Sequence, residues 1–230
     1  MNYLQLCQRT ARECGVSGSG PASVLNQVGE LSRIVAWVAT AHMDIETAHT
    51  DWGWMKRDVS FITVAGQAEY AAEGGAGTCG ITAGTFGVWS GTKYRFRNYN
   101  TVDGNIGEIE MGWVTYDVWR DIYSYGATRY VQTRPMDVAF APDQTTLCLG
   151  PYPAVGYTVT GQYYRAPLAL AADADTPEYP VQFHMMVVYK AMMYYGMYEA
   201  APEVYNRGEM EFAKMMARLD AMRLPEMAFV

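Results

Sequence analysis

The most regular pattern along the chain lies between residues 31 and 52, where apolar residues recur at alternating spacings of three and four. This spacing places them on one stripe of a helix, because 3.6 residues complete each turn. The stripe consists of Leu31, Ile34, Val38, Ala41, Ile45, Ala48 and Trp52. The pattern predicts a long helix that ends at Gly53 and buries this stripe.

Further helical patterns lie near the two ends of the chain. Residues 2–14 predict a short helix that a glycine ends. Pro180 suits the first turn of another helix, which extends to about residue 199. Its buried face is expected to consist of Phe183, Val187, Ala191 and Tyr195. Pro202 begins a last helix to about residue 222, so these two helices should form an antiparallel hairpin.

The middle of the chain has the alternation of strands instead. Val59, Phe61 and Thr63 alternate with Asp58, Ser60 and Ile62, and a second short strand is expected near Tyr70. Residues 73–92 are rich in glycine and are expected to be irregular. The remaining predictions are a strand at 93–98, a helix at 115–124, a hairpin of 138–141 with 146–149 around Pro142 and Asp143, and a strand at 157–165.

The order of these elements is helices, strands and helices again. It predicts an α+β fold, a helical bundle built from both chain ends with an inserted β-rich, sandwich-like domain. We assign residues 1–55 and 179–230 to the helical core and residues 56–178 to the insertion.

Composition narrows the classes of function. The net charge of -7 disfavours general DNA binding, although an acidic wall could still let DNA slide past without adhering. The 18 Tyr, 6 Trp and 15 Met residues suit a protein interface and a large core equally well. The four cysteines form no C-x-x-C pair, which favours free thiols in a reducing cytoplasm. No signal peptide or apolar stretch of membrane-spanning length is apparent, so we expect a soluble protein that stays in the cytoplasm or leaves by lysis.

Three motifs could hold a cofactor or metal, and each has a simpler interpretation. Residues 75–80 spell G-x-G-x-x-G, but poor helix formers follow, which favours a flexible loop over a dinucleotide site. His42, Glu46 and His49 could share a helix flank as metal ligands, but a polar rim that meets a neighbouring helix is favoured. The D-x-D sequence at Asp173 lacks the rest of a calcium loop, so a turn explains it better. We therefore expect no cofactor and no metal.

No arrangement of residues predicts catalysis. The carboxylates are scattered, and no G-x-S-x-G sequence or P-loop occurs, so we expect that the protein is not an enzyme. Lys93, Arg95 and Arg97 alternate along one predicted strand and could face DNA or an acidic partner, although a solvated strand face is the simpler interpretation.

Three stretches of the chain resemble the head–tail adaptor proteins, also called neck or connector proteins, of short-tailed and related bacteriophages. They are GELSRIVAWVATAHMDIETAHTDWGWM with SFITVAGQAEY, then DVWRDIY with TRPMDVAF and TLCLGPYP, and finally GQYYRAPLALAADADTPEYPVQFHMMVVYKAMMYYG. The resemblance spans nearly the whole chain, and the Gly-rich stretch 73–92 is the part without a match.

The resemblance implies a structural subunit at the head–tail junction of the virion, assembled in the host cytoplasm. Its implied partners are the portal protein, copies of itself in a ring that is usually dodecameric, and tail nozzle or tail fibre proteins. Genomic DNA would pass through without sequence-specific binding, and no membrane is involved. The alternatives are a tail-tube or minor tail protein of the same particle and, from another class, a virion-associated cell-wall hydrolase.

The end of the chain suggests one contact site for such a particle. Met227, Phe229 and Val230 gather apolar surface at positions where an exposed tail has no need of it. We expect this tail to bind the portal or the adjacent subunit, with folding back onto its own helices as the alternative.

Overall fold

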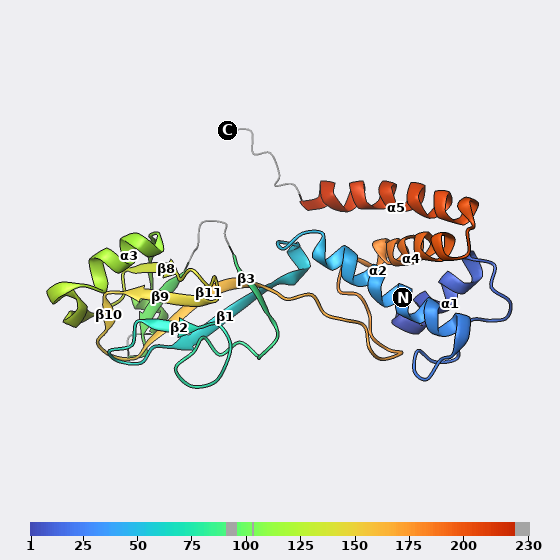
Figure 1. The fold of residues 1–230 in the computed structure, drawn as a ribbon. Helices are drawn as coiled ribbons and strands as arrows, with labels where there is room; N and C mark the ends of the chain where they lie inside the picture. Colours follow the sequence, from blue (N-terminus) through green and yellow to red (C-terminus); the bar gives the residue numbers. More distant parts are fainter. Residues whose placement is uncertain (91–95, 103, 224–230) are drawn as a thin grey trace. The chain divides into compact units, whose positions relative to one another are not determined.

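The computed structural model describes residues 1–90, 96–102 and 104–223 (Figure 1). Helices and several sheets are both present, which confirms the predicted α+β class. The chain divides into two compact units. The helical unit contains Met1–Trp54 and the chain from Pro167 onward, whereas the β-rich unit is Met55–Ala166. The assignment of 56–178 to a separable domain stays a prediction about the protein in solution.

The helical unit is built from four helices. Near the N-terminus, a capping box begins the first helix, since the Asn2 side chain accepts from the Gln5 N–H and the Gln5 side chain accepts from the Asn2 N–H. Proline at the first position favours the start of the last helix. The helices are α1 (Tyr3–Glu13), α2 (Gly29–Thr47), α4 (Met185–Tyr198) and α5 (Pro202–Arg223).

The apolar stripe of α2 forms much of the core of this unit. Ile34, Val38, Ala41 and Ile45 are almost completely buried, as predicted. The predicted end of the helix was wrong, because α2 stops at Thr47 and Ala48 is exposed. Trp52 is nevertheless buried, and its indole Nε1 donates to the Ile45 carbonyl at 3.1 Å. The indole thus satisfies a carbonyl that the ending helix leaves without a backbone partner.

The predicted start of the penultimate helix was also wrong. A 3-10 turn, Val181–Phe183, follows Pro180, and α4 begins only at Met185. Backbone bonds from the Phe183 N–H to the Pro180 carbonyl and from the His184 N–H to the Val181 carbonyl hold this tighter turn.

Two glycines allow α4 and α5 to approach closely. A Cβ atom at Gly208 would lie 2.7 Å from the Tyr189 carbonyl oxygen, and one at Gly196 would lie 2.7 Å from the Tyr205 nitrogen. Both contacts are shorter than a real Cβ atom tolerates, so the packing of these two helices requires the absence of side chains there.

The β-rich unit contains two main sheets and a short helix. In one sheet β11 is central, pairing antiparallel with β1 on one side and with β3 and β4 on the other, while β5 extends β4. The second sheet has the order β2-β9-β8-β6, in which only β6 and β8 are parallel. A parallel pair, β7 with β10, is separate.

The bounds of these elements confirm most of the predicted strands. The prediction of an irregular 73–92 stretch was wrong in part, because β3 lies within it. The elements are β1 (Lys56–Ile62), β2 (Glu69–Ala71), β3 (Phe86–Trp89), β4 (Arg97–Asn100), β5 (Ile109–Glu110), β6 (Gly112–Trp113), α3 (Tyr116–Tyr123), β7 (Gln132–Thr133), β8 (Asp137–Phe140), β9 (Thr146–Gly150), β10 (Tyr152–Pro153) and β11 (Tyr157–Arg165).

One apolar core joins the inner faces of the two main sheets. Phe61 and Val159 come from the first sheet, and Tyr70, Leu147 and Leu149 come from the second. On another face of the second sheet, Trp119 of α3 packs against a smaller apolar cluster. The predicted helix and the β8–β9 hairpin are both confirmed, and the turn residues between β8 and β9 specify the hairpin locally.

All four cysteines are buried free thiols. Burial raises the pKa of Cys7, Cys14 and Cys148 to about 12, and that of Cys79 further still. The thiolate is the reactive form of cysteine. These side chains therefore act as small apolar groups of the core.

Candidate interaction surfaces

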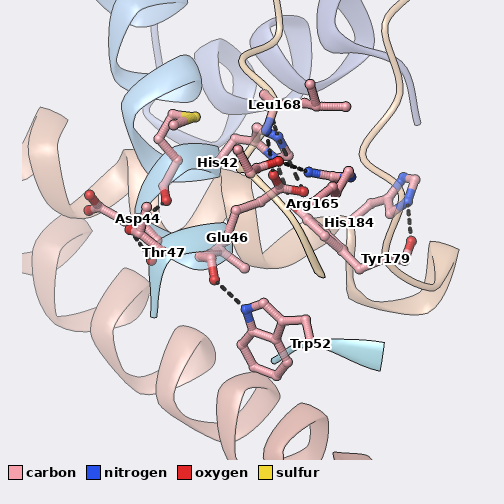
Figure 2. A network of polar contacts seen from close by, with 12 residues as sticks. His42, Asp44, Glu46, Thr47, Trp52, Arg165, Leu168, Tyr179 and His184 are labelled. Atoms are coloured by element: carbon pink, nitrogen blue, oxygen red, sulfur yellow. Dashed lines mark hydrogen bonds and ion pairs between the residues drawn. The ribbon is translucent and has the colours of Figure 1, made fainter. Parts of the chain in front are cut away.

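A buried polar cluster on α2 holds the point where the chain returns to the helical unit (Figure 2). The His42 Nε2 atom lies 2.9 Å from the Leu168 carbonyl oxygen, and the Glu46 Oε2 atom accepts from the Leu168 N–H at 2.8 Å. Two side chains one helical turn apart therefore bind both backbone groups of one residue. This arrangement replaces the sheet partner that an extended segment would otherwise need.

A second set of contacts continues from this cluster towards the start of α4. The Tyr179 hydroxyl lies 3.4 Å from His42 Nδ1, while His184 Nε2 donates to the Tyr179 carbonyl at 3.1 Å. The amino group of Met1 lies 2.7 Å from His184 Nδ1. Burial lowers the pKa of His184, and the positive charge of that amino group lowers it further. The neutral imidazole thus joins the N-terminal segment to the helical hairpin.

The histidines of α2 do not converge on a metal site. His49 turns to α5, where its Nε2 lies 3.1 Å from Asp220 Oδ1, whereas His42 and Glu46 are buried around Leu168. Within residues 1–90, 96–102 and 104–223, no group of three His, Cys, Asp or Glu side chains could hold a metal ion. The cluster is therefore suited to holding chain segments together. The prediction of a polar rim holds for His49 but was wrong for the two buried residues.

The other two motifs also lie in ordinary loops. No helix follows the glycines at 75–80, since the next regular element is β3. Asp173 Oδ1 accepts from the Val24 N–H at 2.6 Å, and Asp175 Oδ2 accepts from the N–H groups of Ala171 and Ala172. These carboxylates close turns and bind neighbouring backbone, as the turn interpretation predicts.

Of the three residues in the predicted basic strand, the structure places one. Arg97 begins β4, and its guanidinium lies 3.5 Å from Glu108 Oε2 and 4.0 Å from Glu110 Oε2. Lys93 and Arg95 lie outside the described residues. The two carboxylates offset the charge of Arg97, which weakens its attraction for phosphate. The tail residues Met227, Phe229 and Val230 also lie outside the described part of the chain.

The outward face of α5 is a candidate interaction surface that the sequence analysis missed. Met210 is 59% exposed, and Ala213, Ala217 and Ala221 are exposed on the same side, opposite the buried Gly208 and Leu219. Polar residues normally occupy such a face. The sequence could have indicated this surface, because Met and Ala residues are spread around the whole circumference of the helix predicted there.

The β-rich unit has a comparable surface on its short helix. Trp119 of α3 points into the unit, while Val118 and Ile122 remain 45% and 44% exposed and Tyr125, just beyond the helix, is also exposed. Apolar side chains thus occupy both faces of α3. Each unit therefore presents an apolar helix surface that its own fold does not cover.

The family model described as SU10 adaptor protein matches residues 1–228, nearly the whole chain. No match was found among the curated proteins. In the part of the chain that the structure describes, no helix combines the length and apolar character needed to cross a membrane.

Proposed function

The chain belongs to the SU10 adaptor protein family and is a structural protein of a phage adaptor, and from this premise we propose that it forms a ring beneath the portal. The ring joins the capsid to the tail and encloses part of the conduit through which genomic DNA leaves. Its function consists of binding, with one surface for the portal, two flanks for neighbouring subunits and one surface for tail proteins.

The observation that carries this proposal is the apolar outward face of α5. The side chains of Ala213, Ala217 and Ala221 are short, so a helix from a neighbouring subunit can approach the backbone of α5 closely. Met210 provides an adaptable anchor beside them. A ring requires two different surfaces on each subunit, because head-to-tail contacts close it. We assign the α5 face to one of these two flanks.

The proposal also assigns a binding role to the apolar tail and to the basic strand. The apolar tail residues Met227, Phe229 and Val230 bind the portal or the adjacent subunit. The basic residues Lys93, Arg95 and Arg97 face an acidic partner or the passing DNA, and the carboxylates beside Arg97 keep that contact weak. Weak contacts suit a conduit, since the genome must slide through it.

The first test replaces Ala217 with Glu in the full-length protein. A charge on this exposed face leaves the fold intact but would be desolvated in a subunit contact, so ring formation should be lost. Mass photometry should find rings for the unmodified protein and monomers for the variant. Ala76→Glu, which makes the same chemical change in an exposed loop of the β-rich unit, should still form rings.

The second test deletes residues 224–230. Melting monitored by circular dichroism should hardly change, whereas cosedimentation with purified portal protein should be lost. Full-length protein that forms rings without binding portal would favour a tail-tube or minor tail protein, and full-length protein that clears peptidoglycan would favour a hydrolase. The adaptor proposal fails if the full-length protein neither forms rings nor binds portal.

A further inference from the structure

A basic pocket on α1 lies outside every surface assigned above. It has a volume of about 430 Å³. Its lining residues are Met1, Gln5, Gln8, Arg9, Arg12 and Met185. The four from α1 follow one another at spacings of three, one and three, which puts them on a single helix face. This face carries arginine and glutamine in a chain whose net charge is -7.

The charges around the pocket do not cancel. Glu13, whose side chain is largely buried, binds Arg9 at 2.6 Å and also Arg207 of α5 at 2.8 Å. One carboxylate therefore serves two guanidinium groups. Arg12 adds a third, and among the described residues its side chain has no ion pair or hydrogen bond. The site keeps a positive charge that the fold itself does not neutralise.

Three of the polar groups that line the pocket are already held in place. The Gln5 side-chain oxygen accepts from the Asn2 N–H at 3.0 Å, which leaves its amide N–H₂ group to donate. Gln8 Nε2 donates to the Pro21 carbonyl, and the ion pair with Glu13 restrains Arg9. A ligand would therefore meet one restrained guanidinium group and one amide donor at a low cost of ordering, whereas Arg12 would become ordered on binding.

We propose that this pocket binds carboxylate side chains from an acidic segment of a protein partner. Guanidinium groups bind planar carboxylates through paired hydrogen bonds, and the pocket has room for one or two such groups. The overall charge of -7 repels a duplex at long range, whereas a short acidic segment experiences mainly the local field. The proposal does not depend on the ring or on contact with the portal.

The test measures fluorescence anisotropy of a labelled hexaglutamate peptide titrated with the full-length protein at low salt. Arg12→Gln should weaken binding about tenfold or more, because a charge-assisted bond to the ligand is lost. This variant breaks no intramolecular ion pair, so its melting temperature should stay unchanged. Arg9→Gln together with Arg12→Gln should abolish binding, while Glu13 keeps its bond to Arg207.

The matched control is Arg129→Gln, which removes the same charge from an exposed position in the β-rich unit. It should bind hexaglutamate within about twofold of the unmodified protein, since Arg129 does not line the pocket and an exposed charge is screened by salt. The proposal is overturned if hexaglutamate does not bind, or if Arg12→Gln and the control Arg129→Gln weaken its binding equally. It is also overturned if a 20-base-pair duplex binds more tightly than the peptide.

Discussion

The two units of this protein close their cores in different ways. In the β-rich unit, aromatic and aliphatic side chains of two sheets meet in one apolar core, and the whole unit comes from one continuous stretch of chain. The helical unit combines segments separated by more than a hundred residues. There His42 and Glu46 bind the backbone of Leu168, and His184 binds the N-terminal segment.

This difference separates two sources of stability. The hydrophobic effect is non-directional, so the stability of the β-rich unit can come from the sum of many apolar contacts. The helical unit has an apolar core as well, but it depends in addition on a few buried polar groups, whose loss leaves partners unsatisfied. Since its two segments must be brought together, it should also be the unit that opens more easily.

The largest effect is expected from a charge placed in the core of the helical unit. Ile45 is 1% exposed, so Ile45→Asp should destabilise that unit by about 4 kcal/mol or more. If the two cores are independent, hydrogen exchange should show lost protection in α2 and α4 while β9 and β11 stay protected. The reciprocal variant, Val159→Asp, should expose the strands and spare the helices. Loss of protection in both units from either change would refute their independence.

A smaller effect is expected where a glycine permits close packing. Gly208→Ala should cost about 1–3 kcal/mol, although alanine gains roughly 1 kcal/mol of helix propensity, because the added Cβ meets the Tyr189 carbonyl. Gly161→Ala tests the other unit, where the added Cβ would clash with the ring of Phe96. Gly53→Ala, with no atom within 4 Å of the new Cβ, is the control. Urea unfolding measures all three, and equal stability of Gly208→Ala and Gly53→Ala would mean that α4 and α5 can separate freely.

The same contrast explains how much of the structure could be predicted from sequence. The β8–β9 hairpin and β11 were predicted because alternation and turn residues specify them locally. The end of α2 was missed because Trp52 continues the helical spacing although the chain has already left the helix. The buried position of Trp52 goes with the hydrogen bond from its indole to the Ile45 carbonyl, and a periodic sequence pattern does not reveal such a bond.

Candidate surfaces were harder to predict than elements. His42 and Glu46 were expected on a rim, and only the return of the chain at Leu168 explains their burial. The basic strand was predicted from the alternation of charged residues, but the carboxylates that bind Arg97 come from another strand and a loop. The pocket on α1 was missed because Arg9 of α1 and Arg207 of α5 share Glu13 only after folding. Contacts between distant segments set each of these outcomes.

One buried tryptophan in each unit allows the contribution of a single hydrogen bond to be compared between the units. Trp52→Phe removes the bond to the Ile45 carbonyl, whereas the Trp119 Nε1 has no bonding partner among the described residues. Both indoles are almost fully buried, so the two substitutions lose similar apolar volume. Trp52→Phe should therefore cost about 1 kcal/mol more than Trp119→Phe in urea unfolding. An equal cost would show that the indole bond contributes little to the end of α2.

The smallest effect is a difference between the units in their response to acid. Because burial lowers the pKa of His184 in the folded helical unit, the unfolded chain takes up a proton first as the pH falls below the ordinary value of 6.5. The stability that depends on neutral His184 is thus present above that pH and is lost on mild acidification. In the β-rich unit burial raises the pKa of Asp143, but bonds from Thr146 and Thr145 outweigh this and lower it to about 2. Its contribution is present above the ordinary value of 3.8 and is lost only as the pH falls towards 2.

The helices should therefore lose protection before the strands between pH 7 and pH 5. Hydrogen exchange at several pH values, read separately for α4 and β9, measures this order. His184→Gln should lower the stability of the helical unit at neutral pH, since the bond to Tyr179 is changed, but it should also flatten the dependence on pH in this range. Asp143→Asn should leave that dependence intact, because the carboxylate of Asp143 titrates well below it. If the His184→Gln protein keeps the full pH dependence, another group controls the acid response, and the buried imidazole does not distinguish the helical unit from the β-rich one.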